Sequence, residues 1–316
     1  MRTTRLLTTT LVALTLVAAA CGNDDDTEVS ESVGESAEAT AEPADEAAFP
    51  VEVTADNGSV AIEAEPQRIV SLSPTLTEML FAVDAGDQVV AVDDQSDFPE
   101  DAPTTDLSGF EPNVEAVASF DPDLVTVSDD INDVVAGLER LDIPVLQLGA
   151  ATSLEDTYEQ IRTLGTATGN AEAADQLVED MMADIDSLVA EVPERDTPVT
   201  YFHEIDNELF TATSSTFIGQ IYALAGLENV ADEADDGSGF PQVSSEFVLE
   251  ADPDVIFLAD ATFSGGAEEV AKRPGWDELT AVQEGRIVEL DPSVSSRWGP
   301  RVVDFLRVVV KETAHV

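Results

Sequence analysis

The chain has 316 residues, of which 66 are Asp or Glu, 13 are Lys or Arg and 2 are His, so its formal net charge is −53. This charge excludes nucleic acid as a partner, because affinity for a phosphate backbone comes from Lys and Arg that release its counterions. Hydrophobic residues make up 43% of the chain, which is enough for a core and excludes a wholly disordered protein. The acidic, Lys-poor composition predicts a monomer.

The first residues have the layout of a secretory signal peptide. Arg2 and Arg5 precede an uncharged stretch that is too short and too rich in Thr to span a membrane comfortably. Cys21 is the only cysteine, so no internal disulfide and no cysteine-based zinc site can form. Residues 17–22, VAAACG, resemble the lipobox of bacterial lipoproteins, in which the cysteine is acylated after cleavage. The resemblance implies removal of residues 1–20 and anchoring at the outer face of the cytoplasmic membrane; the alternative is an ordinary signal peptide.

An acidic segment follows the cysteine. Residues 22–49 contain ten acidic and no basic residues, with many Ala, Ser and Thr. Such a segment cannot bury enough surface to offset its ordering entropy, so we predict that residues 21–49 are the lipidated cysteine and a disordered tether. The remaining residues, 50–316, hold 56 acidic and 11 basic residues, so most of the acidity belongs to the folded body.

Short apolar runs alternate with helical stretches through the folded body. The runs predict strands at 68–72, 89–92, 124–127, 145–148, 198–202, 255–258 and 286–290. Short buried runs separated by helices are typical of a parallel sheet, and the pattern restarts after residue 197. The sequence therefore predicts an α/β fold class, with two Rossmann-like α/β lobes of mainly parallel sheets joined by one long helix.

That helix is predicted at 171–191, between the two sets of strands. Asn170 can cap it, Pro193 ends it, and apolar residues recur on one face at helical spacing. These residues are Ala174, Leu177, Val178, Met181, Ile185, Leu188 and Val189. The predicted division is an N-terminal lobe at 50–168, a linking helix at 169–193 and a C-terminal lobe at 194–316. The alternative is an ordinary crossover helix inside one sheet.

A repeat supports the two lobes. Glu115 lies six residues before the first Asp of an Asp-Pro-Asp motif at 121–123, and Glu246 lies six residues before the same motif at 252–254. Each copy predicts a helix that opens near the Glu, a turn and a buried strand. Two lobes of the same construction would place the two Glu at equivalent points.

Several further motifs occur in a fixed order. They are RIVSLSP at 68–74 with Thr77 and Glu78, SDFP at 96–99, NVE at 113–115 with PDL at 122–124, LDIPV at 141–145, GLEN at 226–229, PQVS at 241–244, and GRIV at 285–288 with GPR at 299–301. In this order they resemble the substrate-binding proteins of ABC importers for cobalamin and iron-siderophores, whose two lobes are joined by one rigid helix. The resemblance covers about residues 60–312 and is closest to the cobalamin-binding members.

The resemblance implies a receptor that delivers a metal chelate, an iron-siderophore or a cobalamin, to a membrane permease powered by a separate ATPase. The family places one Glu on the rim of each lobe to pair with Arg residues of the permease, and Glu115 and Glu246 stand at those positions. The local alternative is that they are first-turn acids favoured by the helix dipole. No catalytic residue and no cofactor is implied.

The ligand is expected between the lobes, where loops leave the carboxyl ends of the strands. The candidate ligand-binding residues are Ser73, Pro74, Gln95, Phe110, Ser128, His203, Phe240, Arg297, Trp298 and Arg301. Each of them has packing of the lobe interface as its alternative role. Gln95, Gly109 and Ser128 stand where the cobalamin-binding proteins have aromatic residues, and Arg297 and Arg301 equally suit an anionic chelate. Haem or another organic anion therefore stays an alternative ligand.

The sequence argues against two other classes of function. With only His203 and His315, a His-rich zinc or manganese site cannot be assembled, so no metal site is predicted. The chain has no G-x-S-x-G, H-E-x-x-H or Gly-rich phosphate motif, which argues against a membrane-anchored extracellular hydrolase. We predict that the protein is not an enzyme, with the hydrolase as the alternative.

Overall fold

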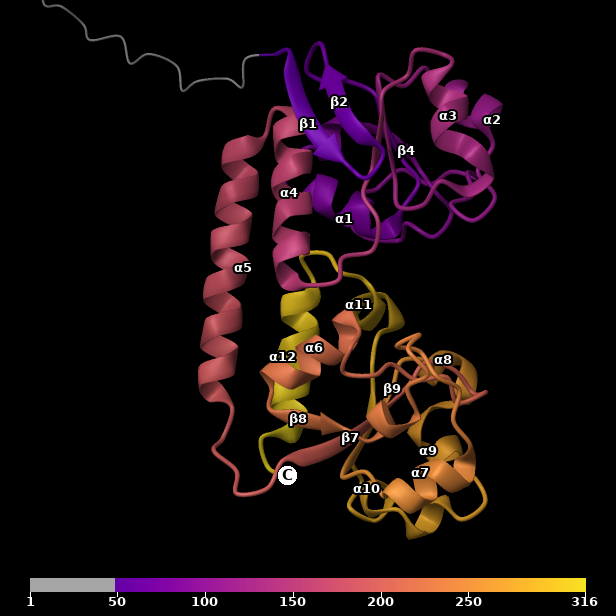
Figure 1. Cartoon of the computed structure of the whole chain (residues 1–316), viewed down its shortest axis with the longest axis vertical. Helices are drawn as coiled ribbons and strands as arrows, with labels where there is room; N and C mark the ends of the chain where they lie inside the picture. The colour runs from indigo at the N-terminus through magenta and orange to yellow at the C-terminus, as the bar shows by residue number, and fades with distance from the viewer. Residues whose placement is uncertain (1–48) are drawn as a thin grey trace, which may run out of the picture. The chain divides into compact units, whose positions relative to one another are not determined.

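The computed structural model describes residues 49–316, so the predicted signal peptide, Cys21 and nearly all of the tether lie outside the described residues. The described residues belong to one compact unit that contains two four-stranded sheets (Figure 1). All neighbouring strands within these two sheets are parallel. The predicted fold class is confirmed, whereas the exact lobe boundaries stay a prediction.

The sheet of the N-terminal lobe has the strand order β4-β3-β5-β6. Its strands are β3 (Ile69–Ser71), β4 (Val89–Val92), β5 (Leu124–Val127) and β6 (Val145–Gln147). Its helices are α1 (Pro74–Ala82), α2 (Val114–Ala118), α3 (Val134–Glu139) and α4 (Leu154–Thr168), with 3₁₀ turns at Gly86–Gln88 and Ile131–Asp133. An antiparallel hairpin of β1 (Val51–Ala55) and β2 (Gly58–Ile62), which was not predicted, precedes them.

The sheet of the C-terminal lobe has the strand order β10-β9-β7-β8. Its strands are β7 (Val199–Glu204), β8 (Leu227–Asn229), β9 (Val255–Leu258) and β10 (Ile287–Glu289). Its helices are α6 (Phe217–Leu224), α7 (Ser245–Ala251), α8 (Ala261–Ser264), α9 (Gly266–Val270), α10 (Thr280–Gln283), α11 (Pro292–Ser296) and α12 (Val302–Thr313), with 3₁₀ turns at Val230–Ala234 and Trp276–Glu278. Strand β8 was not predicted, because three residues with a central Glu form no apolar run.

The sequence repeat has a structural basis in both lobes. In each copy a short helix, α2 or α7, leads through the Asp-Pro-Asp turn into a fully buried strand, β5 or β9. The Asp123 carboxylate accepts the backbone N–H groups of Gln67 and Arg68 at 2.8 and 2.9 Å. The Asp254 carboxylate accepts the N–H of Thr200 at 2.9 Å. The last Asp of each copy therefore ties its turn to the start of the neighbouring strand.

The long helix α5 (Ala171–Glu191) has the predicted bounds and packs against α4 and α12 (Figure 1). Five of the seven predicted apolar residues are buried, but Val189 is 37% exposed, because the neighbouring helices cover a narrower stripe than the sequence indicated. Asn170 is the N-cap residue, as predicted, but its side chain forms no capping hydrogen bond. Its side-chain amide instead donates to the Thr168 carbonyl at 3.2 Å, so it turns away from the helix N-terminus.

One hydrophobic cluster runs through both lobes. It contains Met79 of α1, Ile161 of α4, Met181 of α5, Tyr222 of α6 and Phe305 of α12. Two smaller clusters cover the opposite faces of the two sheets. Because close-packed interiors transmit strain, the shared cluster limits how far one lobe can move against the other without breaking apolar contacts.

Candidate functional site

The carboxyl ends of the parallel strands carry the candidate residues in the N-terminal lobe. Ser73 follows β3 and Ser128 follows β5, and the Ser128 hydroxyl donates to the Ser73 hydroxyl at 2.6 Å. Pro74 is half-buried as the first residue of α1. Gln95 is exposed after β4, and Phe110, further along the same loop, is 71% exposed. The fold therefore brings the two serines together and leaves Gln95 and Phe110 open to solvent.

A cavity of about 440 Å³ lies between the lobes. The N-terminal lobe contributes residues 150–152, which follow β6, and the C-terminal lobe contributes 215–218, 237–240, Ser296 and Trp298. Two candidate residues, Phe240 and Trp298, are in this lining, and Phe240 is 46% exposed. An exposed aromatic ring in a cavity between two lobes offers a contact surface to a ligand.

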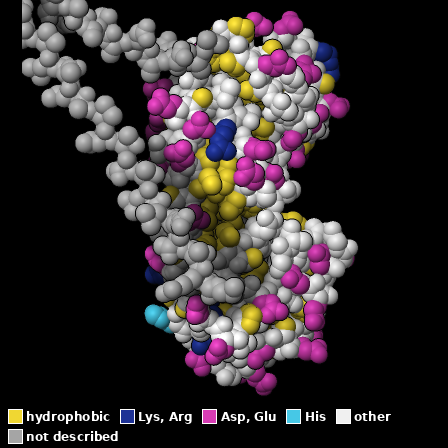
Figure 2. Space-filling view, turned by 60° about the vertical axis from the view of Figure 1, so that its left-hand side comes forward, with side chains coloured by type: hydrophobic (Ala, Val, Ile, Leu, Met, Phe, Trp, Pro, Cys, Tyr) yellow, Lys and Arg dark blue, Asp and Glu magenta, His cyan; other side chains and the backbone are white. Residues whose placement is uncertain are grey.

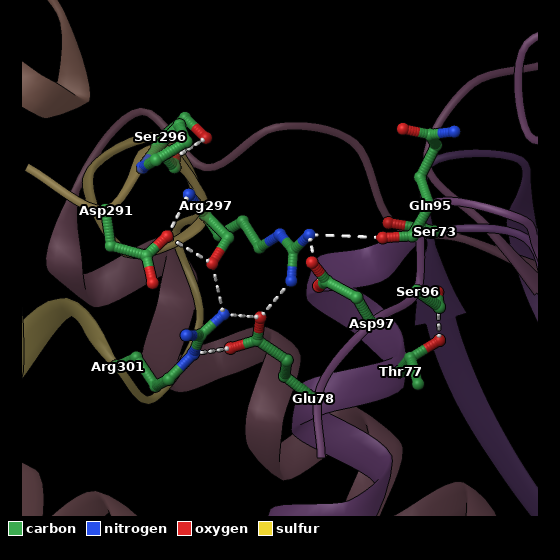
Figure 3. Close-up of polar contacts among 12 residues, drawn as sticks. Ser73, Thr77, Glu78, Gln95, Ser96, Asp97, Asp291, Ser296, Arg297 and Arg301 are labelled. Atoms are coloured by element: carbon green, nitrogen blue, oxygen red, sulfur yellow. Dashed lines mark hydrogen bonds and ion pairs between the residues drawn. The ribbon is translucent and has the colours of Figure 1, made fainter. Parts of the chain in front are cut away.

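A buried ion-pair cluster joins the lobes (Figure 3). The Glu78 side chain, on α1, is 1% exposed and accepts hydrogen bonds from two arginines of the other lobe. Arg301 donates through Nε at 2.8 Å and Nη2 at 2.5 Å, and Arg297 donates through Nη1 at 2.7 Å. Hydrogen bonding to Glu78 raises the pKa of Arg301. The carboxylate thus holds one guanidinium by two bonds and the other by one, which is a strong arrangement.

The two arginines have further partners. Arg297 pairs with Asp97 at 2.8 Å and donates to the Gln95 carbonyl at 3.1 Å. The Arg301 guanidinium lies 4.2 Å from the centroid of the Phe98 ring. Both were predicted as ligand residues, with interface packing as the alternative. The structure places both in the lobe interface, so that neither presents a free guanidinium fork to a ligand.

Neutral hydrogen bonds also cross between the lobes. The Trp298 indole N–H donates to Gln160 at 2.9 Å, and the Thr157 hydroxyl donates to the Trp298 carbonyl at 2.9 Å. The Gln220 amide donates to the Thr152 carbonyl at 2.6 Å. Because Thr152 and Trp298 also line the cavity, these bonds fix two of its walls.

Glu78 received no role from the sequence, although a signal was present. It is the only charged residue in α1, whose sequence is PTLTEMLFA. A lone carboxylate in an otherwise uncharged, apolar helix indicates a buried ion pair, because charged side chains are seldom buried unless paired. Its partners were not identifiable, since Arg297 and Arg301 are 219 and 223 residues away along the chain.

His203 lies in the core of the C-terminal lobe and not at a ligand surface. It is 1% exposed, and its Nδ1 atom is 2.8 Å from the Tyr222 hydroxyl. Burial lowers the pKa of His203 to about 4. The predicted ligand role is therefore corrected, because strand β7 directs this ring into the packed aromatic cluster around Tyr222.

A second buried ion pair lies at the carboxyl end of β7. Glu204 is fully buried, and Arg273 donates to its two oxygens at 2.6 Å each. Burial raises the pKa of Glu204, and the Arg273 guanidinium opposes this shift. Asp260, which follows β9, is 4% exposed, and burial raises its pKa as well. The pairing of Glu204 with Arg273 was not predicted.

Glu115 and Glu246 occupy equivalent places in the two lobes. Both are exposed residues in the first turn of a short helix, α2 or α7. Asn113 and Ser244 cap these helices through their side chains. Within residues 49–316 neither Glu forms an ion pair, so both carboxylates are accessible.

The described residues contain neither a metal-binding cluster nor a membrane-spanning helix. In residues 49–316 no group of three or more His, Cys, Asp or Glu is arranged to hold a metal ion. Over the same range, no helix combines the length and the apolar composition that a bilayer crossing requires. Cys21, the predicted lipidation site, lies outside the described residues.

Comparison with known proteins identifies the family. The periplasmic binding protein family matches residues 69–294. The chain belongs to this family. The membership confirms the resemblance found in the sequence and the predicted role as a substrate-binding protein of an ABC importer, and it does not favour the hydrolase.

Three similar proteins show the range of the family. An uncharacterised ABC transporter substrate-binding lipoprotein of Bacillus subtilis is 32% identical over 81% of this chain and 83% of its own. A cobalamin-binding protein of Halobacterium salinarum is 33% identical over 81% of this chain and 72% of its own. The apo structure of a periplasmic heme-binding protein from Roseiflexus is 25% identical, with a TM-score of 0.71, over 78% of this chain and 98% of that one.

The inter-lobe cluster predicts a large loss of stability on removing its carboxylate. Glu78→Gln should lower the free energy of unfolding by about 3–5 kcal/mol, because two largely buried guanidinium groups lose their common partner. Urea denaturation followed by circular dichroism measures this. The control Asp175→Asn removes an exposed pair with Arg162, whose side chains are 64% and 42% exposed, and should cost less than about 1 kcal/mol. Equal losses in the two variants would contradict the role given to Glu78.

The burial of His203 predicts a pH dependence. Its pKa is 6.5 in the unfolded chain and about 4 in the folded one, so the unfolded state binds more protons between these values. The stability that depends on its neutral form is present above pH 6.5 and is lost as the pH falls toward 4. Urea denaturation at pH values across this range should show a loss of unfolding free energy in wild type that exceeds the loss in His203→Gln by up to about 3 kcal/mol. His315→Gln, at an exposed position, should keep the wild-type pH dependence.

Proposed function

We propose that the protein captures an organic metal chelate, an iron-siderophore or a cobalamin, in the cavity between its lobes and delivers it to an ABC permease. The observation that carries the proposal is the cavity to which both lobes contribute at the carboxyl ends of parallel strands, the usual ligand position in α/β folds. The work is binding and release, with energy from a separate ATPase, so we assign no catalytic residue and no cofactor.

The ligand contacts divide into two chemical kinds. Phe240 and Trp298 line the cavity with aromatic surface, which supplies contact area at a low cost in conformational entropy. Ser73, which is buried, and Ser128 bond to each other outside this lining, at the carboxyl ends of β3 and β5, so a polar contact from them requires a ligand that extends beyond the cavity. Phe110, which is 71% exposed, offers a further aromatic surface at the same end of the lobe. A large chelate with apolar faces and polar edges matches both kinds.

The chain is proposed to act as a monomer held at the outer face of the cytoplasmic membrane. Acylation of Cys21 after removal of residues 1–20 would supply the anchor, and residues 22–49 the tether. The lipoprotein name of the Bacillus subtilis relative supports this arrangement. The high negative charge supports the monomer, because like-charged surfaces repel one another.

Glu115 and Glu246 are proposed to dock the two lobes on the permease. Both are exposed, both begin a helix of the repeat, and each lobe contributes one. Rim charges contribute to orientation and association rate more than to raw affinity. Two such contacts, one on each lobe, would register the receptor on a symmetric partner.

The function is tested by identifying what the protein retains. Protein purified without denaturation should carry, or take up stoichiometrically, a coloured chelate detected by absorbance and native mass spectrometry. Cyanocobalamin and ferrioxamine B are the first probes, titrated by quenching of Trp fluorescence. Release of the probe unchanged in mass supports a receptor, whereas a chemically altered probe would support the hydrolase. If no chelate binds, the proposal is contradicted.

The docking role predicts a loss of uptake without a loss of binding. Glu115→Lys combined with Glu246→Lys should reduce uptake in proteoliposomes that contain the permease and its ATPase by at least about tenfold, because attraction to cationic residues becomes repulsion. Ligand affinity should not change. The control Glu179→Lys with Asp186→Lys makes the same charge change at exposed positions of α5 and should transport normally. Normal uptake by the docking variant would refute the assignment.

A further inference from the structure

The basic residues at the ligand end of each lobe are already paired. The described residues include 11 Lys and Arg, and three of them, Arg273, Arg297 and Arg301, bond to residues at the carboxyl ends of strands or to α1. Arg297 and Arg301 share Glu78, and Arg297 also holds Asp97. Two guanidinium groups and two carboxylates therefore make a cluster with no net charge.

The third arginine is neutralised in the same way. Arg273 donates to both oxygens of the fully buried Glu204 at 2.6 Å. The other eight basic residues do not line the cavity. They are Arg68, Arg140, Arg162, Arg195, Lys272, Arg286, Arg307 and Lys311.

The cavity itself has no charged residue in its lining. Its lining includes Phe240 and Trp298, together with Thr152, Ser215 and Thr216, whose hydroxyl groups already bond to protein groups. A hydroxyl oxygen keeps acceptor capacity, which suits the N–H groups of amides on an uncharged molecule. No cationic side chain in this lining compensates a buried carboxylate of a ligand, which would gain only the partial positive charge of the first turn of α6 in exchange for its hydration.

The surroundings of the cavity add negative charge. Asp94 and Asp129 are exposed just beyond the carboxyl ends of β4 and β5, and Asp206 follows β7. Figure 2, which brings the α5 side of Figure 1 forward, shows that acidic side chains also outnumber basic ones on that face. These carboxylates add negative potential at the carboxyl ends of the strands, which disfavours an approaching anion.

We propose that this cleft selects chelates with no net negative charge, neutral or cationic ones, and rejects carboxylated chelates such as haem. The inference rests on the proposed function, because it concerns the same cavity. An anionic ligand could recruit Arg297 or Arg301 only by drawing it from Glu78, which would leave a carboxylate with 1% exposure short of a partner. The ion-pair cluster thus contributes to specificity, because arginines bonded to Glu78 are not available to pair with a ligand carboxylate.

The test uses two ligand scaffolds on which the charge varies while the chelate core stays the same. Ferrioxamine B is cationic, its N-acetyl derivative is neutral and its N-succinyl derivative carries a carboxylate. Cyanocobalamin is neutral, and its monocarboxylic acid replaces one amide by a carboxylate of nearly the same shape. Dissociation constants are measured for the full set with the intact protein by calorimetry, at low and at high salt.

On whichever scaffold binds, the carboxylate should bind at least about tenfold more weakly than its neutral counterpart, and the difference should shrink at high salt. Asp94→Asn with Asp129→Asn should strengthen binding of the carboxylate by about threefold, as expected for two charges screened by water. The control Glu179→Gln with Asp186→Asn, the same charge change on α5, should leave all affinities unchanged.

The outcomes separate this inference from the function on which it rests. If carboxylates bind as tightly as their neutral counterparts, charge selection is overturned while the receptor function stands. If neither scaffold binds and the purified protein retains no chelate, the proposed function fails and the inference fails with it.

Discussion

The buried carboxylate of Glu78 is the constraint on which the relation between the lobes depends. It is almost inaccessible to water and accepts hydrogen bonds from the guanidinium groups of Arg297 and Arg301, which lie near the C-terminus of the chain. Since an unpaired buried charge costs several kcal/mol, the lobes are favoured in the arrangement in which these three side chains meet. Trp298, adjacent in sequence to Arg297, is thereby brought to Gln160 and to the cavity wall. The polar cluster and the cavity are thus parts of one arrangement.

The apolar core and the polar cluster restrict the lobes in different ways. Helix α5 packs on α4 of one lobe and α12 of the other, and its buried residues belong to a cluster shared by both. Apolar packing is short-ranged and non-directional, so it sets spacing, whereas hydrogen-bonded ion pairs require a particular orientation. A receptor built this way is suited to small closing motions. Three of its arginines, Arg273, Arg297 and Arg301, are held in buried ion pairs and are not available to a ligand.

Local sequence patterns predicted much of the fold. Apolar runs predicted the bounds of β4, β5 and β9, and helical periodicity predicted those of α5. Burial of one face of an element requires apolar residues at a regular spacing, which can be read from the sequence. The β1-β2 hairpin was also present in the sequence, since Asn57-Gly58 between alternating segments is a strong turn signal, but it was overlooked. Of the candidate site, Phe240 and Trp298 line the cavity, while His203 does not reach it. A polar residue on a buried strand does not reveal from its neighbours alone which face it occupies.

The sequence by itself determined the family, the α/β class, the long helix and the duplicated Glu-to-Asp spacing, because each depends on the order of motifs along the chain or on the spacing of nearby residues. Only the tertiary structure decided which charges are free. Arg297 and Arg301 are indistinguishable in sequence from ligand-binding arginines, and Glu78 lies more than two hundred residues before them. Pairing over such a separation depends on how the two lobes meet, and electrostatic energy depends on distance and burial, not on position along the chain.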